Sequence, residues 1–149
     1  MRVIETILKQ VAEATEGVTN YGRGAKAYSN IEGVSYPRIW VHRINPVDTI
    51  HQNGLIVTEY NIVGEVSGKV DFTSDIANES GATELYLNTL ENLQLIFYRF
   101  IGSLNKHPKN KAAIGIAKRN EFVHEYDDNL CGYVFSFTMK IDETIAYQC

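Results

Sequence analysis

The chain has 149 residues, of which 44% are hydrophobic and 21% are charged, and this fits one globular α+β domain, residues 1–149, with a real core. The formal net charge is −4, and the charges are interspersed rather than massed, so composition offers no surface for tight binding to nucleic acid or anionic lipid. Charges at Arg2, Glu5 and Lys9 within the first apolar pattern are unlike a signal peptide or a membrane span. We therefore expect synthesis in the cytoplasm and no membrane contact.

A short amphipathic helix is predicted at the start of the chain, ending near Ala14. Its apolar residues recur at helical spacing and form one stripe, made of Val3, Ile4, Ile7, Leu8 and Val11. A stripe of this kind indicates a helix that packs on a sheet or on another helix.

The stretch from residue 17 to 35 interrupts this periodicity with glycines and small polar residues. Its Gly22-Arg23-Gly24 sequence invites comparison with a phosphate-binding loop. Such a loop requires a preceding strand, a following helix and a defined glycine spacing, and the sequence shows none of these. We interpret the stretch as a surface loop.

Residues from about 36 to 70 predict a long β-hairpin, because bulky residues alternate with period two on both sides of Asn53-Gly54. Asn-Gly suits a type I′ turn, since both positions tolerate a positive φ. In the first strand the pattern places Ile39, Val41 and Arg43 on one face. In the second strand one face is made of Ile56, Thr58, Tyr60, Ile62 and Val66.

The register of this hairpin contains a conflict near Pro46. A two-residue loop places Asp48 opposite Glu59, and like charges that face each other across strands are unfavourable. Pro46 also lacks the N–H group that a ladder uses. We therefore expect a bulge, an edge position or a wider loop within residues 45–49.

The predicted hairpin is too long for one domain to cover. About sixteen residues at roughly 3.3 Å each reach on the order of 50 Å, whereas a globule of this size is roughly 38 Å across. We expect an arm at about residues 44–70 that a neighbouring subunit covers, because an exposed strand edge promotes aggregation. The candidate interface residues are Ile50, Asn53, Gly54, Leu55, Val57, Glu59 and Tyr60. The alternative is a pair of ordinary strands with an irregular loop between them.

The clearest predicted element is a helix over residues 83–105. Its apolar stripe follows spacings of three and four residues, and Pro108 prevents continuation of the helix. The stripe consists of Tyr86, Leu90, Leu93, Phe97, Phe100 and Leu104. We expect this helix to share one core with Phe135 and Phe137.

Two further strands are predicted after the helix, one within residues 112–120 and one over residues 133–141, where apolar and polar residues alternate. The predicted order is helix, two long strands, helix, two strands. Consecutive strands of this kind indicate an α+β fold with an antiparallel sheet and helices packed on it.

The densest group of potential catalytic or metal-binding residues is Glu121, His124, Glu125, Asp127 and Asp128. Carboxylates beside a histidine can bind a hard cation or act as an acid/base pair. The spacing matches no established ligand pattern, and a solvated acidic turn is the ordinary interpretation. The other histidines, His42, His51 and His107, are scattered over different elements, and Cys131 and Cys149 predict neither a disulfide framework nor a thiolate metal site.

The layout of the chain resembles that of small bacteriophage tail-terminator and head-to-tail joining proteins, with their N-terminal helix, long hairpin, helix and closing strand pair. The segments that carry the resemblance are "YPRIWVH", "NGLIVTEYNIVGEV", "LYLNTLENLQLIFYRFIGSL" and "DDNLCGYVFSFTMKI". The resemblance covers nearly the whole chain through residue types rather than through a fixed motif.

This resemblance implies a virion protein, assembled in the host cytoplasm, that forms a hexameric or dodecameric ring at the head-proximal end of a tail. It implies neighbours among the tail, neck and portal-complex proteins, and a lumen through which double-stranded DNA passes without specific binding. It implies no catalytic residue, metal or cofactor. Two other classes stay open: a small cellular α+β interaction module that dimerises, and a metal-dependent hydrolase that uses the His124–Asp128 loop.

Overall fold

The computed structural model describes residues 2–24, 35–70, 79–115, 117–124 and 130–144. Two helices and five strands follow one another as predicted for an α+β domain, with one additional strand near the N-terminus. In chain order they are α1 (Arg2–Ala14), β1 (Asn20–Arg23), β2 (Arg38–Gln52), β3 (Leu55–Lys69), α2 (Glu79–Asn105), β4 (Ala117–His124) and β5 (Leu130–Asp142). None of the described helices is long and apolar enough to cross a membrane.

The five strands form one sheet in the order β1-β2-β3-β5-β4. All neighbouring pairs are antiparallel except β1 and β2, which run parallel. The central strand β3 pairs with β2 from Leu55 to Ser67 and with β5 from Val57 to Lys69. The long hairpin predicted for residues 36–70 is therefore confirmed, and β5 continues it into a three-stranded ribbon.

Strand β1 lies in the stretch that the sequence analysis interpreted as a loop. Gly22 is the reason why it fits beside β2, because a Cβ atom at this position would lie 2.1 Å from the Trp40 ring. The indole of Trp40 donates a hydrogen bond of 2.9 Å to the carbonyl oxygen of Gly24. Four residues are too few for an alternation pattern, which is why no strand was predicted here.

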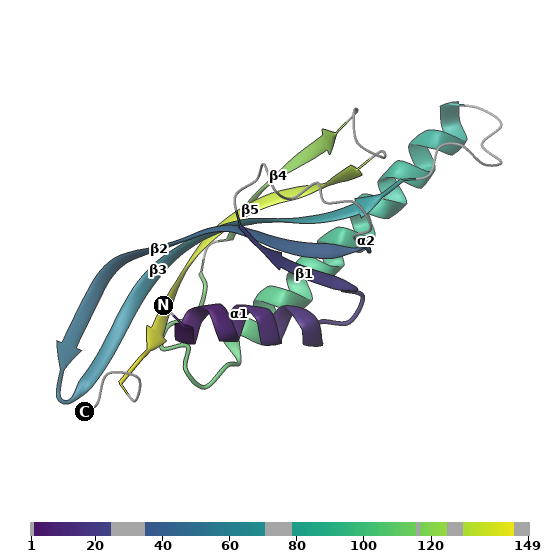
Figure 1. The fold of residues 1–149 in the computed structure, drawn as a ribbon. Helices are drawn as coiled ribbons and strands as arrows, with labels where there is room; N and C mark the ends of the chain where they lie inside the picture. Colours follow the sequence, from purple (N-terminus) through teal and green to yellow (C-terminus); the bar gives the residue numbers. More distant parts are fainter. Residues whose placement is uncertain (1, 25–34, 71–78, 116, 125–129, 145–149) are drawn as a thin grey trace.

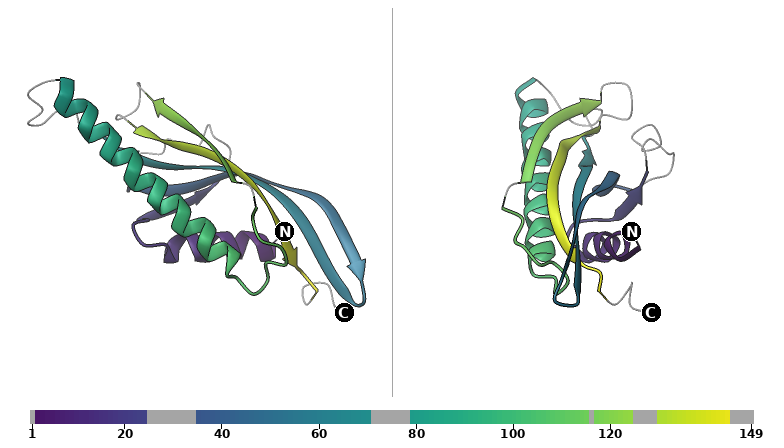
Figure 2. Two further views of the ribbon diagram at one scale, coloured as in Figure 1. Left: turned by 180° about the vertical axis from the view of Figure 1, so that it is seen from behind. Right: turned by 90° about the vertical axis from the view of Figure 1, so that its left-hand side faces the viewer.

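Both helices pack on the same face of the sheet, where α2 lies along the strands and α1 fills the space beside it (Figure 1). The same arrangement is visible from behind and from the side in Figure 2. The predicted core residues of α2 and β5 are confirmed as one buried cluster, with Phe97 and Phe135 ring centroids 5.2 Å apart. Burial of these rings, at roughly 1.5 to 3 kcal/mol for each large side chain, is the main term that holds α2 on the sheet.

Two element boundaries and one face assignment differ from the prediction. Helix α2 begins at Glu79, four residues before the predicted start at 83. A register shift between Val41 and Arg43 leaves Arg43 exposed and buries Ile44, so the predicted common face of Ile39, Val41 and Arg43 is wrong at its last member. Strand β4 begins at Ala117 rather than at residue 112, and it continues to His124 through residues that were predicted as a loop.

Candidate functional site

The end of the β2–β3 hairpin projects beyond both helices, with β5 alongside β3 (Figure 1). Its turn is built as predicted, with φ of 52° at Asn53 and 80° at Gly54. Gln52 pairs with Leu55 directly across this turn. Each position has the positive φ that a type I′ turn requires, which fixes the register of both strands.

The arm carries exposed apolar side chains, which we call the arm tip: Val47, Ile50 and Leu55. Each of the three is between 46% and 49% exposed. Val57 lies opposite Ile50 in the ladder, so the two side chains share a face. Three large apolar residues that are exposed together on a projecting arm indicate a surface for another protein chain.

The predicted irregularity near Pro46 is confirmed as a register shift between Pro46 and Asp48, which leaves Asp48 opposite Glu59. A second shift lies at residue 42. Beyond Val41, no described strand pairs with the outer edge of β2. Bulges and a proline on an edge strand interrupt its row of donors and acceptors, so this edge is protected against simple strand addition.

The other edge of the arm is covered by the chain itself. Strand β5 reaches Asp142, which pairs with Val57, and the Glu143 N–H donates to the Ile56 carbonyl oxygen at 2.8 Å. The Thr144 hydroxyl accepts a hydrogen bond of 3.0 Å from the Ile56 N–H. Two further hydrogen bonds from the Thr144 amide and hydroxyl to the side chain of Asp142 lower the pKa of that carboxyl.

A concave site of about 530 Å³ lies along the arm, on the helix-bearing face of the sheet, and extends from Pro46 to the His51–Ile56 pair next to the turn. Inside it, the buried carboxylate of Glu143 accepts hydrogen bonds from the hydroxyls of Thr58 and Tyr60. Its lining residues are Pro46, Thr49, His51, Ile56, Thr58, Tyr60 and Glu143. These bonds attach the last turn of the described chain to the arm and fix the direction in which the arm leaves the body.

The predicted interface residues fall into three groups. Ile50, Leu55 and Glu59 lie on the arm with Val57, at or near its exposed face, and Asn53 and Gly54 form the exposed turn. Tyr60 is different, because it is 2% exposed and belongs to the hydrophobic core of its own chain. It is therefore removed from the set of candidate contact residues.

A second exposed apolar surface lies on α2, and sequence reasoning missed it. Leu87, Leu95 and Tyr98 are 45% to 55% exposed on the side of the helix that faces solvent. Arg119 of β4 donates a hydrogen bond of 2.7 Å to the Tyr98 hydroxyl, and its guanidinium carbon lies 4.8 Å from the ring centroid. Hydrogen bonds from Gln94 and from Arg119 lower the pKa of Tyr98.

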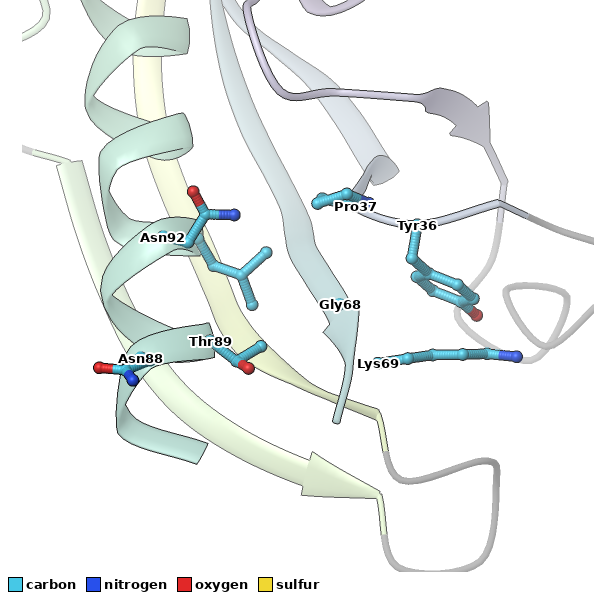
Figure 3. Close-up of a pocket in the computed structure, with 8 residues that line it drawn as sticks. Tyr36, Pro37, Gly68, Lys69, Asn88, Thr89 and Asn92 are labelled. Carbon is cyan, nitrogen blue, oxygen red and sulfur yellow. The ribbon is translucent and has the colours of Figure 1, made fainter. Parts of the chain in front are cut away.

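An open groove of about 520 Å³ separates the first half of α2 from the ends of β2 and β3 (Figure 3). Its lining combines side-chain amides and a hydroxyl from α2 with Tyr36 and Lys69, whose ammonium lies 5.4 Å from the Tyr36 ring centroid. The lining residues are Tyr36, Pro37, Gly68, Lys69, Asn88, Thr89, Asn92 and Leu93. Among the described residues that line the groove there is neither a carboxylate nor a histidine.

The acidic cluster considered for catalysis lies largely outside the described residues, which exclude Glu125, Asp127 and Asp128. Glu121 lies on β4, where it accepts a hydrogen bond from the Tyr86 hydroxyl. Burial, followed by this hydrogen bond, raises the pKa of Tyr86. Over the part of the chain that the structure describes, no three His, Cys, Asp or Glu side chains are close enough to hold a metal ion.

A buried ion pair lies on the sheet face opposite the helices. The Arg38 guanidinium donates to a Glu65 carboxylate oxygen at 3.3 Å, and both residues are at most 1% exposed. The rings of Tyr36 and Trp40 each lie with their centroids 5.1 Å from the Arg38 guanidinium carbon. His42 lies 3.5 Å from the second carboxylate oxygen of Glu65. The pair holds the start of β2 to the end of β3.

Comparison with protein-family models finds no match for this chain, and comparison with curated proteins finds none either.

Proposed function

We propose that the chain is a structural virion protein that forms a ring at the head-proximal end of a phage tail, as a tail-terminator, tail-completion or neck subunit. The observation that carries this proposal is the arm, a hairpin with fifteen residues in each strand whose end projects past the helices and exposes Val47, Ile50 and Leu55. An isolated subunit gains nothing from a projecting apolar hairpin. A subunit in an assembly gains contact area from it.

The distribution of exposed apolar side chains favours a ring over a dimer. The arm tip and the α2 surface lie at different ends of the sheet. Strand β4, which lies next to α2, pairs with residues 130–137 of β5. The outer part of the arm pairs with the other end of β5, where Val57 lies opposite Asp142. A two-fold dimer covers both patches only if each arm reaches the α2 surface of the other copy in the same contact. A head-to-tail contact covers both patches, and it closes into a ring when the rotation between subunits allows.

The proposed neighbours are a tail or neck protein on one side of the ring and a portal-complex protein on the other. Double-stranded DNA passes through the lumen without sequence-specific contact in this proposal. The net charge of −4 supports that role, because an acidic subunit repels the phosphate backbone rather than retaining it.

The test is assembly of the purified chain, alone and co-expressed with the products of the two genes that flank its own. Mass photometry and negative-stain imaging are expected to show closed rings in at least one of these preparations. A compact dimer in all of them would support the interaction module instead and would overturn the proposal.

Substitution of Ile50 or Leu55 by Asp is expected to weaken ring formation by roughly one to two orders of magnitude. Each buried aliphatic side chain contributes about 1.5 to 3 kcal/mol, and an unpaired carboxylate in the interface adds a desolvation cost. Thermal unfolding of the subunit is expected to stay within about 2 °C of the parent, because both side chains are exposed. Thr6→Asp, on the exposed surface of α1, is the matched control and is expected to assemble normally.

Removal of divalent metal ions distinguishes this proposal from the hydrolase alternative. Extensive dialysis against a chelator is expected to leave both the melting temperature and ring formation unchanged. A loss of either would show that a metal ion is bound, and the His124–Asp128 segment would then be the candidate metal site.

A further inference from the structure

The β2–β3 hairpin and the stretch from α2 to β4 differ in the sign of their charged residues. Between Ile44 and Gly68 the chain has three acidic residues and no lysine or arginine. Between Asn92 and Asn120 it has no acidic residue and six basic ones: Arg99, Lys106, Lys109, Lys111, Lys118 and Arg119. Lys109 and Lys111 flank Asn110, which bridges to Ile141 at the arm end of β5, so the basic residues on α2 and β4 themselves are Arg99, Lys118 and Arg119.

On the arm, Asp48 is an exposed carboxylate whose cross-strand neighbour is Glu59. Like charges in this position repel each other. Within the described residues, Asp48 forms no ion pair. Lys140 of β5 lies opposite Glu59 on the other side of β3, so Asp48 is the member of this pair that a cation from another chain would complement.

On the α2 surface, Arg119 is held in place by aromatic rings rather than by a carboxylate. Its guanidinium carbon lies 4.8 Å from the ring centroid of Tyr98 and 5.6 Å from that of Tyr133. No carboxylate of the described chain pairs with it. Contact with aromatic faces and the hydrogen bond to Tyr98 orient the guanidinium at low entropic cost, and its remaining N–H groups suit a carboxylate.

The bulges and Pro46 decide how the arm makes contact. They interrupt the outer edge of β2, so a regular ladder with a second sheet is disfavoured. The arm can still make contact through the side chains of the face that carries Ile50 and Leu55. Asp48 lies on this face too, because it is two residues before Ile50 in the same ladder.

We infer that the arm tip of one copy docks on Leu95 and Tyr98 of the next copy, with Asp48 of the arm paired to Arg119 of that copy. The inference rests on the proposed ring, and it names the two surfaces that close it. Apolar contact supplies the affinity, and the charge pair sets the register and rejects an arm-to-arm contact, which would bring Asp48 and Glu59 of two copies together.

The experiment is a charge exchange measured as ring formation in a concentration series. Asp48→Arg and Arg119→Glu are each expected to weaken assembly at least about tenfold, because each places like charges in the contact. The double variant is expected to return to within about threefold of the parent. Asp48→Arg is also expected not to lower the melting temperature of the subunit, because it replaces a repulsive pair with an attractive one across from Glu59.

Lys106→Glu is the matched control, since it makes the same charge change as Arg119→Glu at the end of α2, away from Tyr98. It is expected to assemble like the parent. If the parent forms rings but the single variants assemble equally well, the docking inference is overturned and the ring proposal stands. The same holds if the double variant does not recover assembly. A parent chain that forms no ring in any preparation would overturn the ring proposal and this inference with it.

Discussion

Phe97→Ala is expected to lower the free energy of unfolding by about 3 to 5 kcal/mol, the usual cost of removing a buried aromatic side chain. Phe97 is 2% exposed, and its ring lies against Phe135 with centroids 5.2 Å apart. Phe135 in turn contacts the rings of Phe100 and Phe137. Truncation therefore opens a cavity in the middle of the aromatic cluster that holds α2 on the sheet.

Urea unfolding followed by circular dichroism measures this loss. Leu95→Ala is the matched control, because Leu95 is on the same helix and exposed, and it is expected to change stability by no more than about 0.5 kcal/mol. Equal midpoints for Phe97→Ala and the parent would show that the assigned core does not hold the fold together.

The long hairpin and the main helix were predictable because their signals are local and repeated. Asn53-Gly54 fixes a two-residue turn, and the alternation on both sides fixes which face is buried. Even the bulge near Pro46 followed from local chemistry, since the missing N–H and the Asp48–Glu59 repulsion both favour an irregular ladder. The spacing of the α2 stripe defines a helix in the same repeated manner.

The parts that were not predicted depend on tertiary contacts. Strand β1 exists because Gly22 lets the backbone approach Trp40, and a four-residue strand has no period of its own. The shift at residue 42 exchanged the faces of Arg43 and Ile44, which no alternation pattern can anticipate. Strand β4 extends to His124 because β5 provides a partner that far, although its sequence is largely polar.

The candidate contact residues on the arm could be predicted, whereas the burial of Tyr60 and the surface on α2 could not, for a related reason. A turn and its flanking residues can be placed on an arm from sequence, and Ile50 and Leu55 are exposed there, while their role in a subunit contact stays a prediction. Tyr60 was misassigned because the last turn of the described chain returns to bury it with Glu143, a contact between residues 83 positions apart. The α2 surface was missed because a single exposed Leu is ordinary on a helix, and only the structure groups Leu95 with Tyr98 and Arg119.

Loss of either partner of the Arg38–Glu65 pair is expected to cost about 3 to 5 kcal/mol, because the remaining charge is left buried without its partner. Both residues are at most 1% exposed, with the guanidinium 3.3 Å from the carboxylate. Arg38 also contacts the Tyr36 and Trp40 rings, and its Nε donates to the Ser67 hydroxyl at 3.4 Å. Arg38→Ala therefore removes packing as well as charge.

Urea unfolding of Arg38→Met, Glu65→Leu and the double variant separates these contributions. Each single variant is expected to lose several kcal/mol, whereas the double variant is expected to recover to within about 1 to 2 kcal/mol of the parent, since two apolar side chains replace two desolvated charges. Single variants that lose less than about 1 kcal/mol would show that solvent reaches the pair. If Arg38 and Glu65 are coupled, the double variant must lose less free energy of unfolding than the two single variants together. A loss equal to that sum would show that packing against Tyr36 and Trp40, rather than the ion pair, holds β2 and β3 together here.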